Sequence, residues 1–432
     1  MTKYIFLALS FLCIFAGMSC KKNPVAPPTY PLQLSVQDVT CTEAYLKLSL
    51  SANETQRTIV LKRSDSAIAT ITLARTDSSF VDQGLLPKKS YTYTLTAGTL
   101  SASAQATTLD TSSHNWMFQT FTFNGDVGSC VLNDAAIIND TLAYAVGEIY
   151  LKDSTGQFDP LPYNFARWNG VSWQLLKVTV PFRGVNITPP LSGIFSLSQN
   201  RIWLVGGLAI NGNGYTWVPY DVRTITGFDS LSFTKCWGSS SSDIFFVGLN
   251  GSLVHYNGSS WAKIGSGTTT DIQDIWGGTD ATTGATYALA TVSTVYYGGV
   301  SELLRIRGTQ LDTLSTNGLS WSIRGVWFDS KDYYIVGDGM YYKESLGNGL
   351  WQSFQQGVTH NYIDAIRGNA RNDIIATGDF GTVLHFNGVS WHDYTQELNI
   401  GSYNLDAVSI RGNLFVAVGW NSDRAIAVIG KR

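Results

Sequence analysis

A repeated stretch of sequence is the feature that most constrains the fold. Residues Gly378 to Trp391 read Gly-Asp-Phe-Gly-Thr-Val-Leu-His-Phe-Asn-Gly-Val-Ser-Trp, and Gly248 to Trp261 carry the same landmarks at the same 13-residue separation. Each copy has an apolar strand ending in Gly, a second short apolar strand, and an Asn-Gly turn before Trp. A repeat of this kind indicates one structural unit used several times along the chain.

The apolar strand that ends in a small residue gives the number of units. Most of its endings are 41 to 47 residues apart, and the first gap of 59 fits an insertion in the first unit. Four short strands at this period are typical of a β-propeller blade, because the two apolar faces of each blade are covered only by its neighbours. Seven units are predicted, with endings at Gly147, Gly206, Gly248, Ala290, Gly337, Gly378 and Gly419.

The last unit predicts how the ring closes. Only 13 residues follow Gly419, so its outermost strand is missing at that end of the sequence. Residues 115 to 123 have the Trp and the alternation of such a strand and precede the first unit. We therefore expect them to pair as the outer strand of the last blade, which removes a free sheet edge. In the other units this strand is marked by Trp173, Trp261, Trp351 and Trp391, with Leu311 in the fourth unit and no clear counterpart in the second.

The Asn-Gly dipeptide before Trp predicts a tight hairpin. Asn-Gly readily adopts the positive φ angles of a type I′ turn, and the Trp that follows is expected to pack between blades.

Composition agrees with an all-β protein and argues against a nucleic-acid partner. Charged residues make up 14% of the chain, while 42 Gly and 12% aromatic residues indicate many strands joined by turns. No apolar stripe of helical period is sustained over three turns. A formal net charge of −3 lacks the basic excess of a nucleic-acid-binding protein.

The first residues read as a targeting segment. Lys3 precedes an apolar run over residues 4–16, too short to span a bilayer comfortably. The sequence Gly-Met-Ser-Cys, ending at Cys20, resembles the lipobox of bacterial lipoproteins. That resemblance implies a signal peptide over 1–19, lipidation of Cys20, and a proline-rich tether over 20–29. It implies a membrane partner and a lipid-anchored place in the cell envelope, where we expect the outer membrane and leave the leaflet open. An ordinary secretory signal is the alternative.

Residues 30–110 alternate apolar and polar side chains, which predicts a small antiparallel sandwich. Leu85, Pro87 and Tyr91 have the spacing of a tyrosine corner. This stretch resembles the fibronectin type III family, whose members most often serve as spacers or adhesive modules.

Residues 115–432 resemble seven-bladed propellers of the photosystem II assembly-factor-like kind and their bacterial lipoprotein relatives. The resemblance rests on the strand endings and the Asn-Gly-x-Ser-Trp motif described above. It implies a propeller that binds partners on one rim, formed by the segments that lead into the innermost strands and by the turns between second and third strands.

Candidate binding residues follow from that geometry. Arg324, Asp364 and Asp406 each lie one residue into an inner strand and are expected near the channel mouth. Carboxylates beside an Arg and exposed aromatic residues suit a protein or glycan partner. Ordinary turn chemistry is the alternative for any single Asp. The predicted ligand-binding residues are Arg324, Asp338, Asp364, Asp379, Tyr403, Asp406 and Trp420.

No cofactor or metal is predicted. Cys41, Cys130 and Cys236 are far apart and form no C-x-x-C, which favours three buried thiols. His255 and His385 hold the same repeat position in different blades, so a structural role is expected for both.

Catalytic signatures are absent from the sequence, which lacks G-x-S-x-G, H-E-x-x-H, a phosphate loop and a calcium loop. A non-catalytic binding module is therefore the main hypothesis. A carbohydrate-active enzyme, a glycosidase or lyase using Asp364 and Asp406, is the alternative, since paired carboxylates serve acid and base roles. A scaffold or assembly factor for another envelope protein is a third hypothesis.

Overall fold

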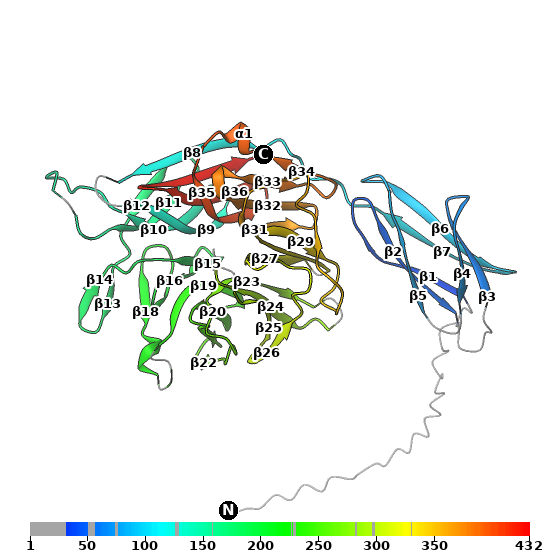
Figure 1. Ribbon diagram of the computed structural model, residues 1–432, viewed down its shortest axis with the longest axis horizontal. Coiled ribbons are helices and arrows are strands. Elements are labelled where there is room, and N and C mark those ends of the chain that lie inside the picture. Colours follow the sequence, from blue (N-terminus) through cyan, green and yellow to red (C-terminus); the bar gives the residue numbers. More distant parts are fainter. Residues whose placement is uncertain are drawn as a thin grey trace, which may run out of the picture. The chain divides into compact units, whose positions relative to one another are not determined.

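The computed structural model describes residues 32–50, 57–73, 77–125, 129–157, 159–225, 227, 230–280, 283–295, 299–329 and 331–432. The predicted signal peptide, tether and lipidated Cys20 lie outside these residues. The chain divides into two compact units, the first holding most of β1 to β7 and the second the strands from β8 onward (Figure 1). No helix in the described part of the chain is long and apolar enough to cross a membrane.

The first unit has two antiparallel sheets, ordered β1-β2-β5 and β4-β3-β6-β7. An ion pair and a hydrogen bond link the two sheets. Arg63 lies 3.0 Å from Asp82 Oδ1, and the Tyr93 hydroxyl donates to Asp82 Oδ2 at 2.6 Å. All three are at or near the core, and Tyr93 is fully buried. The strands are β1 (Leu32–Val39), β2 (Ala44–Leu50), β3 (Arg57–Arg63), β4 (Ser66–Leu73), β5 (Ser78–Asp82), β6 (Ser90–Ala97) and β7 (Leu100–Thr107).

The described residues of the second unit form seven four-stranded antiparallel sheets, numbered here in chain order. The first sheet consists of β9 (Val131–Asn139), β10 (Leu142–Ile149), β11 (Tyr163–Trp168) and β12 (Trp173–Leu176), and the second of β15 (Gly193–Ser198), β16 (Arg201–Val205), β17 (Ala209–Gly212) and β18 (Trp217–Tyr220). The third consists of β19 (Ser232–Ser240), β20 (Asp243–Leu249), β21 (Leu253–Tyr256) and β22 (Trp261–Lys263), and the fourth of β23 (Ile272–Thr279), β24 (Thr286–Ser293), β25 (Ser301–Arg307) and β26 (Gln310–Leu314). The fifth consists of β27 (Ile323–Asp329), β28 (Asp332–Gly337), β29 (Gly339–Lys343) and β30 (Gln352–Ser353), and the sixth of β31 (Ile363–Ala370), β32 (Asp373–Gly378), β33 (Val383–Phe386) and β34 (Trp391–Asp393). The seventh consists of β35 (Asn404–Arg411), β36 (Leu414–Asn421), β37 (Arg424–Lys431) and β8 (Met117–Asn124).

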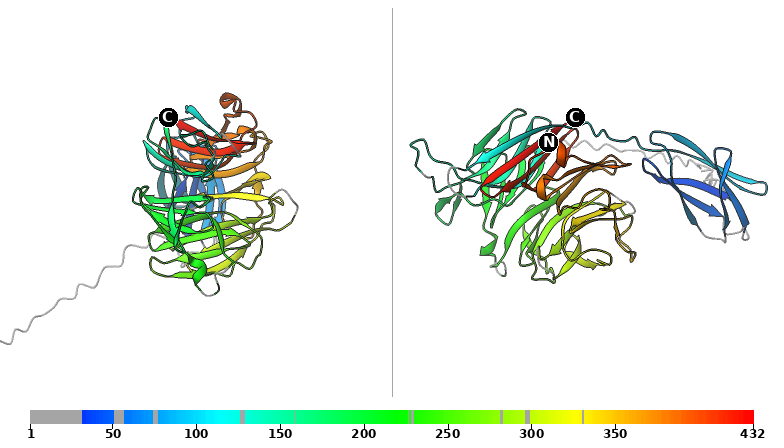
Figure 2. Two further views of the ribbon diagram at one scale, coloured as in Figure 1. Left: turned by 90° about the vertical axis from the view of Figure 1, so that its left-hand side faces the viewer. Right: turned by 45° about the horizontal axis from the view of Figure 1, so that its top comes forward.

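The seventh sheet is completed from the other end of the chain. Strand β8 pairs with β37 along its whole length, from Met117 opposite Lys431 to Asn124 opposite Arg424. The cyan β8 and the red β37 lie side by side in both ribbon views (Figures 1 and 2). The predicted closing role of residues 115 to 123 is confirmed, with the strand beginning two residues later.

Apolar clusters join each sheet to the next and the seventh sheet back to the first. Val416 and Val418 of β36 pack with Ala143 and Ala145 of β10 in the cluster that closes the ring. Six further clusters each combine residues of two successive sheets. Burial of these faces is the main stabilising term, because a four-stranded sheet alone leaves both faces in water.

The repeated Gly at the end of the second strand is required by a close backbone approach. A Cβ at Gly378 would lie 2.0 Å from the Tyr362 carbonyl oxygen, and one at Gly419 only 1.8 Å from that of Asn404. Gly147, Gly206, Gly248 and Gly337 approach a carbonyl at, or just before, the start of the first strand of their own sheet in the same way.

The fourth sheet departs from the predicted strand endings. Val292, rather than Ala290, pairs with Ile272 in the register that Gly378 has opposite Ile363. The prediction of Ala290 was wrong by two residues. Residues two apart in a strand point to the same face, so small size alone did not distinguish these positions.

The Asn-Gly turns differ from the predicted type I′. The Asn387 N–H donates to the Ser390 carbonyl at 3.2 Å, so the central residues of the turn are Gly388 and Val389 rather than Asn387 and Gly388. Gly388 has φ +94° and Val389 does not have a positive φ, so only the first central residue is left-handed. This is the pattern of a type II′ turn. The Asn387 side chain instead accepts the N–H groups of Val389 and Ser390, at 2.9 Å each. The Asn side chain therefore caps the turn.

The fourth strand of the second sheet begins at Trp217, which the sequence analysis missed. It follows Asn213-Gly214-Tyr215-Thr216, and Asn213 Oδ1 accepts the N–H groups of Tyr215 and Thr216. The same motif is therefore present with Thr in place of Ser.

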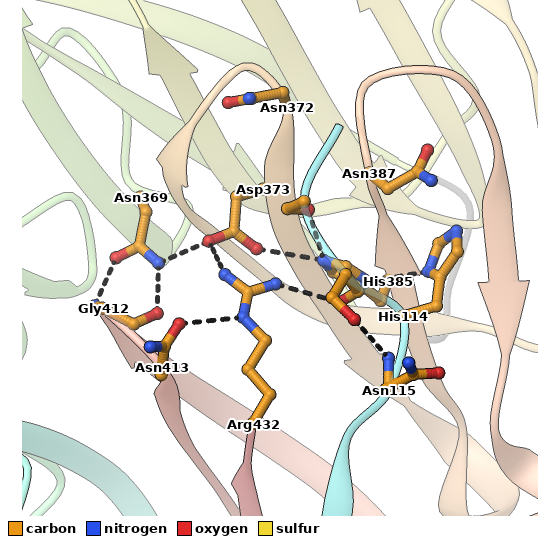
Figure 3. A network of polar contacts seen from close by, with 12 residues as sticks. His114, Asn115, Asn369, Asn372, Asp373, His385, Asn387, Gly412, Asn413 and Arg432 are labelled. Atoms are coloured by element: carbon orange, nitrogen blue, oxygen red, sulfur yellow. Dashed lines mark hydrogen bonds and ion pairs between the residues drawn. The ribbon is translucent and has the colours of Figure 1, made fainter. Parts of the chain in front are cut away.

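A polar network fastens the segment before β8 to the end of β37 (Figure 3). His114 Nδ1 lies 2.8 Å from His385 Nδ1, and His385 Nε2 lies 3.0 Å from Asp373 Oδ1. Arg432 reaches the other oxygen of Asp373 and lies 4.4 Å above the ring of Trp116. Two imidazole nitrogens at this distance need one proton between them, so the contact requires at least one neutral ring.

The other repeated histidine pairs with the equivalent aspartate. His255 Nε2 lies 2.8 Å from Asp243 Oδ1, and both aspartates begin the second strand of their sheet. This arrangement agrees with the structural role predicted for the two histidines. Cys41, Cys130 and Cys236 are free and buried, as predicted.

Replacing Gly378 by Ala is expected to destabilise the second unit by about 3 kcal/mol, because the new methyl group overlaps the Tyr362 carbonyl. Urea unfolding followed by Trp fluorescence measures this unit alone, since all 13 Trp lie at or after position 116. Gly265→Ala is the control, because no atom lies within 4 Å of its Cβ position. Equal midpoints for the two variants would contradict the close-approach explanation.

The histidine network predicts that stability falls in acid. Burial, together with the nearby His385, His392 and Arg432, lowers the pKa of His114 to about 4, and burial also lowers the pKa of His385. The folded state therefore binds these protons less readily than the unfolded chain, whose histidines titrate near pH 6.5. The contribution of this network to stability should be constant above about pH 6.5 and decline as the pH falls towards 4.

His114→Gln should make that decline shallower by about 1 kcal/mol, a value reduced for the partial exposure of the ring. Denaturant unfolding of both proteins between pH 4 and pH 8 gives the comparison. Parallel curves would show that the contact between His114 and His385 does not control the acid sensitivity.

Candidate functional site

A polar cavity lies where the first strands of all seven sheets converge. In each of six first strands, a buried apolar residue packs between sheets and the next residue, which is polar, points into the cavity, as with Ile323 and Arg324. The cavity has a volume of about 200 Å³. One residue from each sheet lines it at this level: Asn133, Ser192, Thr234, Gln273, Arg324, Asp364 and Asp406.

This cavity is here called the mouth. Two ion pairs form its floor. Lys235 Nζ lies 3.0 Å from Asp134 Oδ2, and Arg367 donates to Asp274 Oδ1 and Oδ2 at 2.7 and 2.9 Å. These four residues also line a second cavity of about 150 Å³, so they separate the two spaces. The two residues of each ion pair come from sheets that are two apart in the ring. Sequence analysis did not identify these four residues.

Each floor ion pair also contacts the sheet that lies between the two sheets it joins. Asp134 accepts the N–H of Ile194 at 3.2 Å, and Asp274 accepts that of Val326 at 3.0 Å. Each carboxylate thus ties three successive sheets together at the channel.

The mouth brings together five of the seven predicted residues. Arg324 lies 2.7 Å from Asp364 Oδ1 and 3.7 Å from Asp406 Oδ1. The Trp420 indole N–H donates to Asp406 Oδ2 at 2.9 Å. Asp379, in the turn η2 (Asp379–Gly381), is close enough to Asp364 and Asp406 to interact with both electrostatically.

Asp364 is the most deeply placed of the three carboxylates. Its side chain is 1% exposed, and neither of its oxygens accepts a hydrogen bond from the described residues, although Arg324 forms the ion pair. Burial raises the pKa of Asp364 well above its usual range, Arg324 opposes this, and the charges of Asp406 and Asp379 add to it. Burial and Asp406 likewise raise the pKa of Asp379. The mouth therefore holds more carboxylate than its one guanidinium neutralises.

The two other predicted residues lie on the same rim but apart from this cluster. Asp338 is exposed in the turn between β28 and β29, where its backbone bonds Ser322 and the Tyr341 hydroxyl. Tyr403 packs against the apolar cluster between the sixth and seventh sheets, and its carbonyl accepts the N–H of Gly381 at 2.6 Å. A ligand-binding role for either residue stays a prediction.

Exposed apolar residues surround the mouth, and the sequence analysis missed most of them. They lie in the turns between second and third strands, or just before a first strand, which the antiparallel order places on one rim. Phe380, 60% exposed, has φ +57°, a left-handed conformation unfavourable for its side chain. The aligned repeat carries Asn250 at this position, also at positive φ, so the alignment contained the signal. The apolar rim residues are Leu249, Val300, Trp321, Phe380 and Trp420.

No group of three His, Cys, Asp or Glu in the described part of the chain has a geometry that holds a metal ion. The contacts within the mouth are hydrogen bonds and ion pairs, which suit recognition of a polar or charged group.

The ring of sheets and its polar mouth define a β-propeller, and solved structures of that fold are similar to this chain. A structure of YCF48 bound to D1 peptide aligns with a TM-score of 0.52 and 10% identity, over 73% of this chain and 97% of that one. YCF48 from Cyanidioschyzon merolae aligns with a TM-score of 0.51 and 12% identity, over 72% and 98%. No protein-family model and no curated protein matches the sequence. The predicted all-β propeller fold is confirmed, and identities this low support the fold alone.

Arg324→Met is expected to destabilise the second unit by about 3 kcal/mol near pH 8 and by clearly less near pH 5. Without the guanidinium, the buried Asp364 carboxyl favours its protonated form still more, and keeping that form costs more as the pH rises. Urea unfolding at the two pH values measures the difference. Arg307→Met is the control, because its pair with Asp312 is exposed and worth at most about 1 kcal/mol. An equal loss at both pH values would contradict the coupling of Arg324 to Asp364.

Proposed function

We propose that this chain is a lipid-anchored cell-envelope protein whose propeller binds a segment of a partner protein at the mouth, without catalysis. The seven sheets and the apolar clusters between them support a seven-bladed propeller. The 3-plus-4 arrangement of β1 to β7 supports a fibronectin type III-like spacer. The lipobox-like sequence at Cys20 supports the anchor, and with it a place in the outer membrane.

The observation that carries the proposal is the ring of exposed apolar side chains around a polar pocket. Trp321, Phe380 and Trp420 leave 40%, 60% and 37% of their surfaces in water at one rim. Large aromatic residues beside a charged pocket are typical of protein-binding hot spots. Phe380 also keeps a strained backbone there, and strain of this kind gathers at functional positions.

The size of the mouth favours one side chain of a larger partner over a free small molecule. Its volume of about 200 Å³ is below the roughly 300 to 1,000 Å³ of small-molecule sites. The rim would then hold the flanking residues of the partner. YCF48, a similar propeller, has a structure with a bound peptide, which agrees with this mode.

The carbohydrate-active enzyme has less support. Asp364 is 1% exposed and paired with Arg324, a position that suits a fixed ion pair better than an acid in contact with a sugar. A glycan partner on the same rim is tested by the experiments below.

Phe380→Gly separates binding from stability. Glycine adopts positive φ without strain, so this exposed change should stabilise the second unit by about 1 kcal/mol while weakening partner binding about tenfold. Selection of displayed random 12-residue peptides on the immobilised full chain supplies ligands, and titration calorimetry gives their affinities. Val171→Ser, an exposed apolar residue in a turn of the opposite rim, is the control. Peptide affinities unchanged in Phe380→Gly would remove this rim from the proposal.

A further inference from the structure

We propose that the mouth binds a basic side chain, lysine or arginine, of the partner polypeptide. This inference rests on the proposed function and specifies the group that the pocket recognises. It commits to a polypeptide, and a neutral glycan is an outcome of the test.

The charge of the mouth selects a cation. Five aspartates and three basic residues line it, and Asp379 beside Asp364 and Asp406 adds a sixth carboxyl group. The floor pairs neutralise two of the aspartates and two of the cations. Of the remaining groups, Arg324 faces both Asp364 and Asp406, so an incoming anion would meet a guanidinium that already has two carboxylate partners. An incoming cation would meet surplus carboxylate.

The environment of Asp364 also favours a cationic ligand, independently of the number of charges in the mouth. It is a buried carboxyl group that lines the cavity, and its cationic partner, Arg324 at 2.7 Å from Oδ1, also faces Asp406. One shared guanidinium leaves acceptor sites of this buried carboxylate unused, and unused buried acceptor sites are costly. Ammonium and guanidinium groups are donors only and carry the opposite charge, so they supply what Asp364 lacks.

The rest of the cavity suits a long side chain. Leu249 and the faces of Trp420 and Phe380 offer apolar surface at the rim, where the methylene groups of Lys or Arg pack well. Amide and hydroxyl groups line the opposite wall and accept further N–H donors. They belong to Asn133, Ser192, Thr234 and Gln273.

Binding of a cation should be coupled to proton release. Burial and like charge raise the pKa of Asp364 and of Asp379, and a ligand cation would lower both values. Any proton leaving these carboxyl groups passes to solvent. Affinity for a basic peptide should therefore rise between pH 5 and pH 8, whereas affinity for a neutral analogue should not.

The test uses peptides selected from the random 12-residue library on the full chain. Enriched sequences should share one Lys or Arg next to apolar residues. A synthetic peptide with norleucine in place of that basic residue should bind about tenfold more weakly, because it keeps an alkyl chain but loses the charge. In the double variant Asp379→Asn, Asp406→Asn, the two peptides should differ less in affinity and the pH dependence should be weaker, because Asp364 is the one carboxyl group of the cluster that remains beside Arg324. Asp423→Asn, in the exposed turn between β36 and β37 on the same rim but outside the mouth, is the matched control and should behave as the parent protein.

The outcomes separate this inference from the proposed function. Enriched peptides that need Phe380 but share no basic residue, or that share an acidic one, would overturn the inference and leave the proposed function standing. Failure to enrich any peptide, or binding of neutral oligosaccharides that Asp406→Asn abolishes, would overturn both. A shared basic residue whose contribution to affinity falls in the double variant supports both.

Discussion

The pairing of β8 with β37 is the interaction on which the second unit depends. Each sheet has two apolar faces, and the first and seventh sheets cover theirs only if the ring closes. The ladder joins residues near position 120 to the last residues of the chain, and Asp373, His385 and Arg432 hold the segment that precedes it. Closure therefore requires the whole array to be in place. The cluster around Val418 is a long-range contact rather than a local one.

The fold could be predicted from the sequence because its main requirement is local. In six of the seven sheets the second strand passes so close to a carbonyl at the start of the first strand that no room remains for a Cβ, and Gly recurs at that spacing. A second recurring feature is a Trp packed against a Gly. Trp237 packs against Gly277 in the first strand of the next sheet, and Trp327 packs against Gly368 in the same way, so a Cβ at either glycine would overlap an indole ring. Prediction failed where one repeat carries a different residue at an equivalent position. Val292 replaces Gly in the fourth sheet, and Thr216 replaces Ser in the second.

The site was predicted in part for the same reason. Arg324, Asp364 and Asp406 occupy one repeat position, so knowing where one points places the others. The floor could not be predicted, because Arg367 reaches Asp274 across 93 residues of sequence, from a sheet two places away in the ring. Only three-dimensional closure brings those strands within reach. The apolar rim was missed because single exposed residues such as Phe380 carry no periodicity, although the aligned repeats set it against Asn250.

The channel holds charge in two layers that differ in their balance. In the floor, each carboxylate has a cation and a backbone N–H, and the layer stabilises the ring by tying three sheets at each point. In the mouth, Asp364 and Asp406 share Arg324 while Asp379 adds further negative charge, an arrangement that raises the energy of the unliganded protein. A mouth with equal numbers of carboxylates and cations would stabilise the ring better. The mismatch is stabilising only in the presence of a cation, which is why we assign the mouth to binding and the floor to architecture.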